Sequence, residues 1–319
     1  MITLNQNIFV ATITNLIAYS IYQDNYKLGD DISRLLDIFR SDDVPLGDGK
    51  VVHTSDLPTI SNLDINSSSL LTLSAPSIDE QYIEISEYKK VSLSINEYLL
   101  RGAFVDEGAL GLLASYLIGT MQIAKKLHMY DRVRAVVMGL NGVSTNVTLT
   151  GFAYDATDTA QEDNAKRTAN TNMFYRKLIE EIKLAGKGAT VNVTDGSSPA
   201  TTIKVYERPE NMVCIISNEL FSALDVDTLA TLLNSSEITR NVPIELVTMD
   251  YSTIGLITVN PNVAFLLSKD KVQYGYFYQV ATQFFDASNL NTQNWLHFSD
   301  YCDQVYRAYS KTITLTNFY

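Results

Sequence analysis

The chain has 319 residues, of which 46% are hydrophobic and 19% charged, so it is long and apolar enough to bury one large core or two. Its 36 acidic residues outnumber 24 basic ones, and the formal net charge of −12 argues against tight sequence-independent binding of duplex DNA, which needs basic patches. Two cysteines, Cys214 and Cys302, lack the spacing of a zinc site; two reduced thiols are favoured, although sequence leaves a disulfide open.

The N-terminal segment shows helical spacing in two pieces, residues 8–22 and 30–40. Polar residues interrupt the first piece and no positively charged region precedes it, so it resembles neither a signal peptide nor a membrane-spanning helix. We therefore expect a soluble intracellular product. The second piece has one apolar face, which must pack against its own core or a neighbouring subunit.

A turn-rich stretch at 41–49 leads into an extended, polar ribbon at 50–95. Strand-like alternation returns at its end, in residues 83–85 and 91–95. Its apolar residues are too few for a two-sided core, and an isolated ribbon of this kind is only marginally stable. We therefore expect the ribbon to find no partner within its own chain and to lie on a second copy, which covers its open edges.

Residues 106–138 form an unusually long helical pattern, about 45 Å if unbroken. Three glycines weaken it by about 1 kcal/mol each against alanine, which we interpret as close approach of another backbone. A long helix inside an ordinary globular domain remains an alternative. The apolar track along the helix consists of Leu110, Leu113, Leu117, Met121, Ala124, Leu127, Tyr130, Val133 and Val137.

The second half of the chain mixes strands and helices. A strand at 143–152 precedes an acidic turn region at 155–163 and an amphipathic helix at 168–184. Five consecutive apolar residues at 212–216 are typical of a fully buried strand. Short helices are predicted at 218–224 and 227–233, and further strands at 244–249, 256–259, 265–285 and 305–315.

Residues capable of catalysis do not assemble into a recognisable site. His53, His128 and His297 stand apart from any serine or cysteine nucleophile motif. Asp225 and Asp227 lack the remaining ligands of a calcium loop, and the glycine-rich turns lack the rest of a phosphate-binding loop. We predict no catalytic residue, no cofactor, no cofactor-binding residue and no metal ligand.

The junction between ribbon and helix resembles that of tailed-bacteriophage major capsid proteins. The resemblance lies in EYKKVSLSINEYLLRGAF at residues 87–104, then DEGAL at 106–110 and the long helix, with a strand-then-helix pattern at 213–230 in support. It extends diffusely over nearly the whole chain. It implies an α+β chain with the Hong Kong 97 (HK97-like) capsid fold: an N-terminal arm, an extended E-loop hairpin, a spine helix in a peripheral (P) domain, and an axial (A) domain.

The implied domains follow the order of the chain. Residues 1–47 form the arm, 48–95 the E-loop, 96–185 with 301–319 the P domain, and 186–300 the A domain. Expected E-loop contacts with a neighbouring subunit are Leu63, Ile65, Leu71 and Leu73. The corresponding candidates on the spine helix are Leu110, Leu113, Leu117 and Met121.

The resemblance implies a major capsid (head) protein of a tailed double-stranded DNA bacteriophage. Pentamers and hexamers would form an icosahedral or prolate shell, held by many modest contacts that each subunit makes at once. The shell would enclose the DNA without sequence-specific binding and without a membrane. We expect assembly in the host cytoplasm and a final place in the virion.

Further partners are expected around this shell. A portal protein is one. Because no long charged coiled-coil segment precedes the arm, a separate scaffolding protein is another. Lys50 is the only lysine between Lys27 and Lys89, which gives no basis for covalent cross-linking.

Two alternatives remain open at this point. An encapsulin-like cargo compartment shares the fold and needs a pocket for a cargo tail; packaged DNA would distinguish it. A soluble acidic α/β hydrolase or binding protein predicts a monomer or small oligomer with a concave polar site. Size-exclusion chromatography would distinguish that case.

Overall fold

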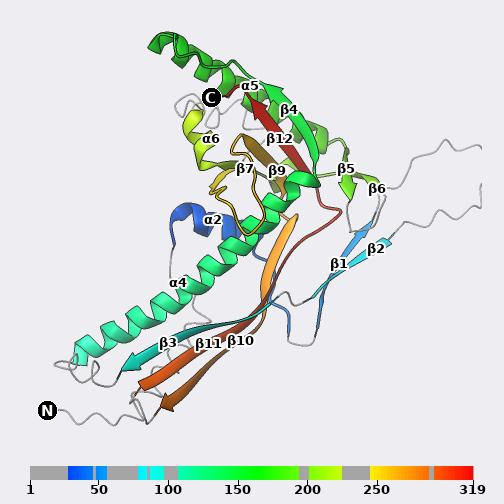
Figure 1. Cartoon of the computed structure of the whole chain (residues 1–319). Helices are drawn as coiled ribbons and strands as arrows, with labels where there is room; N and C mark the ends of the chain where they lie inside the picture. The colour runs from blue at the N-terminus through cyan, green and yellow to red at the C-terminus, as the bar shows by residue number, and fades with distance from the viewer. Residues whose placement is uncertain are drawn as a thin grey trace, which may run out of the picture. The chain divides into compact units, whose positions relative to one another are not determined.

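The computed structural model describes residues 28–45, 48–55, 78–84, 87–96, 107–193, 201–224, 245–286 and 291–318 (Figure 1). Two compact units make up the chain. Unit 1 consists of Met1–Lys50, Ile83–Val133 and Tyr274–Cys302, and unit 2 of Val51–Tyr82, Arg134–Gln273 and Asp303–Tyr319. The predicted helices at 8–22 and 227–233 lie outside the described residues.

A five-stranded sheet forms the centre of unit 2. Its order is β4 (Thr145–Thr150), β12 (Ser310–Thr316), β9 (Val263–Ser268), β7 (Met212–Ser217) and β8 (Glu245–Met249). β12 runs parallel to β4 and antiparallel to β9, and β7 runs antiparallel to β9 and parallel to β8. β7 and β9 are buried at every position, as continuous apolar runs covered on both faces should be. The predicted strands at 143–152, 212–216 and 244–249 are therefore confirmed. The strand predicted at 305–315 is confirmed only from Ser310, because residues 305–309 form a turn.

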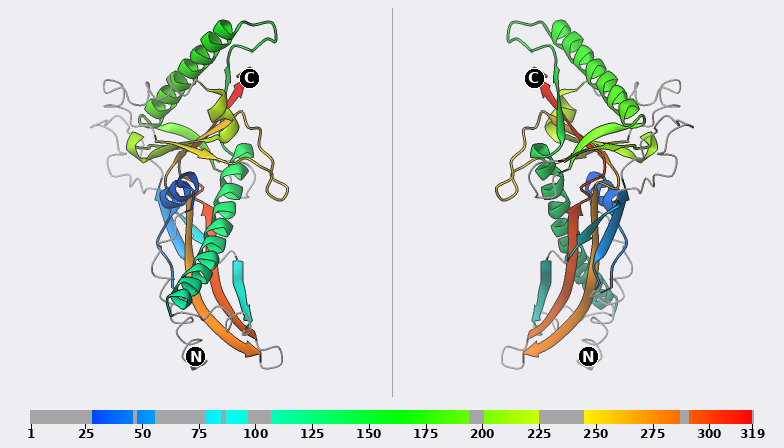
Figure 2. Two further views of the ribbon diagram at one scale, coloured as in Figure 1. Left: turned by 90° about the vertical axis from the view of Figure 1, so that its left-hand side faces the viewer. Right: turned by 90° about the vertical axis from the view of Figure 1, so that its right-hand side faces the viewer.

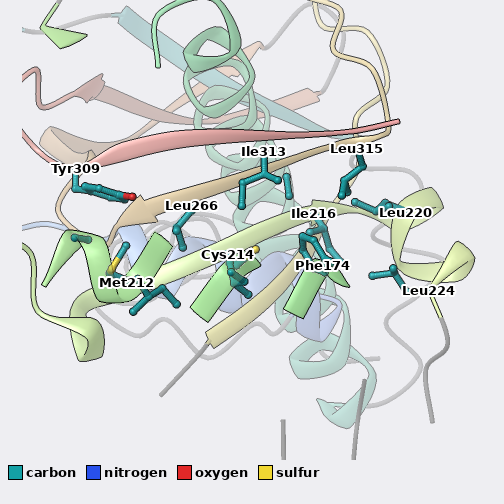
Figure 3. Close-up of a cluster of buried hydrophobic side chains, with 14 of the residues drawn as sticks. Phe174, Met212, Cys214, Ile216, Leu220, Leu224, Leu266, Tyr309, Ile313 and Leu315 are labelled. Atoms are coloured by element: carbon teal, nitrogen blue, oxygen red, sulfur yellow. The ribbon is translucent and has the colours of Figure 1, made fainter. Parts of the chain in front are cut away.

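The helix α5 (Ala160–Ala185) packs against this sheet. Phe174 of α5 lies in one apolar cluster with Cys214 and Ile216 of β7 and Leu266 of β9 (Figure 3). The prediction that 155–163 is entirely turn is wrong at its end, because the helix begins at Ala160. A capping box starts it there: the Thr159 hydroxyl accepts from the Glu162 amide, while the Glu162 carboxylate accepts from the Thr159 amide.

Shorter elements complete unit 2. α6 (Asn218–Ala223) follows β7, with Ser217 accepting a hydrogen bond from the Leu220 amide as its N-cap, and confirms the helix predicted at 218–224. β5 (Ala189–Val193) and β6 (Thr201–Val205) form an antiparallel pair. β1 (Lys50–Ser55) and β2 (Ile78–Ile83) form another two-stranded sheet.

The strand predicted at 256–259 is wrong. Ile254 and Ile257 instead close a tight turn, each donating its amide to the carbonyl of the other. Gly255 stands between them with φ +58°, a left-handed conformation that ends an extended run. Apolar composition alone could not distinguish this turn from a strand.

A three-stranded sheet forms much of unit 1, in the order β10 (Val272–Asp286), β11 (Asn291–Gln304) and β3 (Glu87–Asn96). β3 pairs antiparallel with β11 from Asp300↔Glu87 to Asn291↔Asn96. The expectation that the ribbon up to residue 95 has no partner in its own chain is therefore wrong for β3. Its alternating apolar residues, too few for a core by themselves, lie opposite buried residues of β11, such as Leu296 beside Val91.

The long helix is confirmed as α4 (Glu107–Gly139), and the second N-terminal piece as α2 (Asp30–Phe39), which buries Leu35, Leu36 and Phe39. The apolar track predicted along α4 is partly wrong, since Ala124 and Leu127 are exposed. Each step of three residues falls about 60° short of a full helical turn, so a track of such steps leaves the buried face. No helix among the described residues is long and apolar enough to cross a bilayer.

The buried face of α4 in unit 1 includes two polar residues that the apolar pattern missed. Gln122 and Lys125 are buried there, alongside Ile118, Met121 and Met129. Lys125 is tolerated because its amino group donates to Gln279 Oε1 and lies 4.0 Å from the centre of the Tyr276 ring.

Candidate assembly surfaces

The predicted contact residues fall in three different situations. On α4, Met121 is 2% exposed and therefore faces the interior of its own chain, while Leu117 is partly buried. Leu110 and Leu113 lie within the bounds of α4, but outside the residues whose side chains are described. Four E-loop candidates lie outside the described residues altogether: Leu63, Ile65, Leu71 and Leu73.

Since β3 belongs to the sheet of unit 1, the ribbon is from here on the strand pair β1 and β2 alone. Gln81 holds this pair at its base. The Gln81 amide donates to the carbonyl of Gln304 at 2.7 Å, and its side-chain oxygen accepts from the Tyr306 amide at 3.0 Å. Lys271 holds the same backbone segment, residues 304–306. Its Nζ donates to the carbonyls of Val305 at 2.9 Å and Tyr306 at 3.2 Å. Burial lowers the pKa of Lys271 to about 8.

The ribbon presents exposed side chains, some of them close to this base. Val51 and Tyr82 are 42% and 57% exposed. His53 Nδ1 lies 3.5 Å from Glu80 Oε1, and both side chains are mostly solvent-accessible. Because an isolated two-stranded sheet is only marginally stable, further cover is expected to stabilise it.

The three-stranded sheet of unit 1 presents exposed aromatic side chains from β3 and β10. Tyr88 is 74% exposed and Phe284 55%. The Phe284 ring is stacked on Trp295 with 6.4 Å between ring centres, and His297 Nε2 lies 2.9 Å from Thr282 Oγ1. Large amphipathic rings of this kind are enriched at protein interfaces.

An ionic cluster joins α4 to β3 and β11 within unit 1. His128 Nε2 lies 3.2 Å from Asp300 Oδ2, and Asp300 is fully buried. Arg132 Nη1 lies 2.7 Å from Glu87 Oε1, and Lys89 Nζ 2.8 Å from Glu87 Oε2. The hydrogen bond from Lys89 lowers the pKa of Glu87; burial opposes this, and the charges of Arg132, Lys89 and His128 reinforce it.

An open cavity of about 500 Å³ lies between α2, α4 and β10 in unit 1. Arg40, Lys125 and Lys126 bring positive charge to its lining, and Asp37 and Asp43 bring negative charge. The Arg40 guanidinium carbon lies 5.0 Å from the centre of the Tyr276 ring. Arg40 Nη2 also donates to both carboxylate oxygens of Asp43, at 3.0 and 3.1 Å.

The two cysteines and the carboxylate of Glu181 lie in the protein interior. Neither Cys214 nor Cys302 forms a disulfide; both are buried, and burial raises the pKa of the Cys214 thiol to about 12. Glu181 accepts from Lys177 at 2.9 Å and from Lys311, which holds two parts of unit 2 together. Among the described residues, no group of three or more His, Cys, Asp or Glu side chains is placed to hold a metal ion.

Comparison with known proteins gives a consistent result. A family model described as Phi29-like phage major capsid protein matches residues 5–303. No curated protein matches the chain. Among solved structures, the capsid of Staphylococcus phage Andhra matches with a TM-score of 0.58 and 10% identity over 88% of this chain and 83% of that one.

Two further capsids share the fold at similarly low identity. The capsid of cyanophage P-SCSP1u matches with a TM-score of 0.55 and 11% identity over 88% of this chain and 87% of that one. The head of Helicobacter pylori bacteriophage KHP40 matches with a TM-score of 0.52 and 8% identity over 91% and 92% of the two chains. The α+β fold predicted from the sequence is thus that of phage capsid structures.

Proposed function

The chain belongs to the family of Phi29-like phage major capsid proteins, and we infer that each protomer joins the shell through its ribbon and the aromatic face of its three-stranded sheet. It is a major capsid protein, its copies assemble into a multi-subunit shell, and its place is the capsid of the virion. The family match favours this function over the cargo compartment and the acidic hydrolase or binding protein.

The ribbon's role in contacting a neighbouring subunit is supported by the fact that its two strands do not form a core of their own. β1 and β2 pair only with each other among the described residues, and Gln81 ties them to the backbone of residues 304–306. Side chains of the ribbon, such as Tyr82 next to Gln81, are exposed. A neighbouring subunit is the natural cover in a shell, where each subunit makes several such contacts at once.

We propose the cavity of unit 1 as the acceptor of a neighbour's ribbon. Residues 51–82 contain four acidic residues, Asp56, Asp64, Asp79 and Glu80, and no lysine or arginine. The cavity lining carries three cations against two carboxylates. Opposite charges on the two surfaces favour their encounter and fix its register.

A charge swap tests this pairing. Lys126→Glu and Glu80→Lys should each reduce the yield of shells, and the double variant should restore much of it. Glu210→Lys, an exposed site in unit 2, is the control for the change of net charge. Equal yields from all four variants would refute the cavity as acceptor, while leaving the shell function in place.

We propose a revised domain layout for the capsid subunit. The arm at 1–47 is retained. Because β3 pairs with β11, the E-loop is taken to end before Glu87, and β10 and β11 are counted with β3 and the first part of α4 in the P domain. The A domain then centres on the five-stranded sheet of unit 2 and includes α5.

The finer features of the shell are also proposals. They comprise pentamers and hexamers in an icosahedral or prolate arrangement, a portal, a separate scaffolding protein, assembly in the host cytoplasm and no catalytic role. The net charge of −12 supports confinement of double-stranded DNA over adhesion to it. Measurable binding of this chain to duplex DNA at 150 mM salt, roughly physiological ionic strength, would contradict that part.

Electron microscopy of negatively stained product tests the assembly itself. The chain is produced alone and together with a candidate scaffolding protein from the same phage. We expect uniform shells only in the second case. Native-size shells from the chain alone would refute the separate scaffold, and small oligomers under both conditions would overturn the shell proposal.

A further inference from the structure

The loop between β8 and β9, residues 251–259, is a protruding and uncharged turn in unit 2. Figure 2 shows it extending beyond these two strands, in gold. Its sequence, YSTIGLITV, contains no acidic or basic residue. Leu256 at its tip is 102% exposed, so the side chain has no cover within its own chain.

The tip of this loop is held in one conformation. Ile254 donates its amide to the Ile257 carbonyl at 3.1 Å and accepts the reciprocal bond at 2.9 Å. Gly255 adopts a left-handed φ of +58° between them, and the hydroxyls of Thr253 and Thr258 lie 3.3 Å apart. Because two backbone hydrogen bonds close it, this turn presents Leu256 at a fixed position. It therefore loses little conformational freedom when Leu256 is buried.

Both ends of the loop are fixed as well. The Arg134 guanidinium donates to the Ser252 carbonyl at 2.9 Å and its hydroxyl at 2.8 Å, and lies 3.2 Å from Asp250 Oδ2. Tyr251 is buried and donates its hydroxyl to the Ile215 carbonyl at 3.3 Å, and Val259 is buried too. A single apolar side chain on a surface is ordinary. Here, however, hydrogen bonds and burial fix both ends of the loop that presents Leu256, and this arrangement calls for an explanation.

We propose that the 251–259 loop inserts Leu256 into a concave surface on a second copy of this chain. The inference rests on the proposed shell function, in which each protomer has copies as neighbours. Two copies, each with net charge −12, repel one another, so an uncharged contact surface is where they approach at least electrostatic cost. A single convex tip is not complementary to itself, so the contact is heterologous, the type that closes into rings.

Substitutions of Leu256 test the contact. Leu256→Asp should raise the protomer concentration needed for assembly by about tenfold or more, since a leucine no longer becomes buried at each contact. Leu256→Met keeps an apolar tip of similar volume and should assemble as the unaltered chain does. The melting temperature of unassembled protomers should not change, because Leu256 contacts nothing there.

A photo-reactive benzoylphenylalanine at position 256 gives a second readout. In assembled shells it should cross-link to another copy of this chain, and mass spectrometry then identifies the receiving residues. Cross-linking to a different protein or to none overturns the inference, as does normal assembly of Leu256→Asp. If Leu256→Asp lowers the melting temperature, the cross-link alone decides.

These experiments also distinguish a failure of the loop contact from a failure of the proposed shell assembly. If the unaltered chain forms no shell under any condition, the proposed assembly and the loop contact fail together. If it forms shells and position 256 makes no contact with a second copy, only the loop contact fails.

Discussion

The five-stranded sheet of unit 2 and the three-stranded sheet of unit 1 are completed in different ways. In unit 2, β7 and β9 are buried along their whole length by residues of the same chain. In unit 1, β3 and β10 leave side chains such as Tyr88 and Phe284 exposed. The first sheet has its core within one polypeptide, whereas the second has a surface that a neighbour can cover.

The interactions inside the two units differ as well. The unit 2 cluster is almost entirely aliphatic and aromatic. Unit 1 buries Asp300, Gln122 and Lys125, whose desolvation must be offset by partners such as His128 and Gln279. Apolar packing is insensitive to pH and salt, while ionic contacts respond to both. The apolar cluster of unit 2 is therefore expected to be insensitive to both, whereas the ionic contacts of unit 1, like the buried Lys271 of unit 2, should respond.

The largest expected effect is in the unit 2 core. Phe265 of β9 is fully buried and its ring centre lies 5.8 Å from that of Tyr251, so Phe265→Ala should cost about 4 kcal/mol of protomer stability. Phe284→Ala in unit 1 should cost under about 0.5 kcal/mol in the free protomer, but should reduce assembly. Urea unfolding of unassembled protomers measures both. Equal losses at the two sites would remove the contrast between the sheets.

A pH titration reveals the one strongly perturbed lysine described in unit 2. Lys271 is 1% exposed, and burial lowers its pKa from 10.5 to about 8. Between these values the unfolded chain binds more protons at this site than the folded one, so the contribution of Lys271 to stability rises with pH. The gain is on the order of 3 kcal/mol across this window and is absent below pH 8, where both states are protonated.

Lys271→Met is the control for this titration, because other groups titrate equally in both proteins. The difference in stability between the unaltered chain and Lys271→Met should grow from pH 8 to pH 10. A constant difference over that range would show that the amino group is solvated in the folded protomer.

Unit 2 was also the more predictable unit from sequence, for the same physical reason. A strand buried on both faces must be apolar throughout, so residues 212–216 alone indicate β7. In unit 1, the long repeat of α4 is equally direct, since a helix of 33 residues repeats its pattern over many turns. Local composition determines elements of this kind.

Unit 1 depends on pairing that no local pattern contains. β11 was missed, although Leu296 and Phe298 alternate there with polar residues, because its partner β3 lies about two hundred residues away in the chain. The burial of Lys125 depends on its contacts with Gln279 and Tyr276, which sequence spacing does not connect to it.

In unit 2, the start of α5 could have been predicted from the sequence, because Thr159 and Glu162 have the spacing of a capping box.

The candidate contact residues were less predictable than the fold. Met121 belongs to the apolar track, but the track does not indicate which member faces a neighbour and which faces the chain's own interior. The exposed tip at Leu256 was predicted to lie in a strand. An assembly surface is defined by what the fold leaves uncovered, and this depends on the complete fold.

Gly275 of unit 1 is closely packed against Tyr301. A substitution at this position measures how readily the Tyr301 side chain can move. A Cβ at Gly275 would lie 2.6 Å from the Tyr301 hydroxyl, which donates to the Asp42 carbonyl at 2.6 Å. Gly275→Ala should therefore cost about 2 kcal/mol by displacing Tyr301. Gly139→Ala is the matched control, because nothing lies within 4 Å of its Cβ position at the end of α4, and it should be neutral or slightly stabilising. Thermal unfolding compares the two, and equal melting temperatures would show that Tyr301 moves freely.

The smallest expected effect is at the ionic cluster, and it has a defined pH dependence. The pKa of Glu87 is held below its ordinary value of 4.5 by the hydrogen bond from Lys89 and, against the opposing effect of burial, by the charge of Arg132. A carboxyl group with a lowered folded pKa contributes stability above its unfolded pKa and loses it as the pH falls through the folded value. Because Glu87 is one-third exposed, this contribution should be under about 1 kcal/mol and should decrease further at high salt. Unfolding of the Glu87→Gln protomer at pH 7 and at pH 3 measures it against exposed Glu84→Gln; the two variants should differ at pH 7, and the difference should be smaller at pH 3. A difference of the same size at both pH values would mean that Glu87 acts through packing, and unit 1 would then resemble unit 2 more than the ionic cluster suggests.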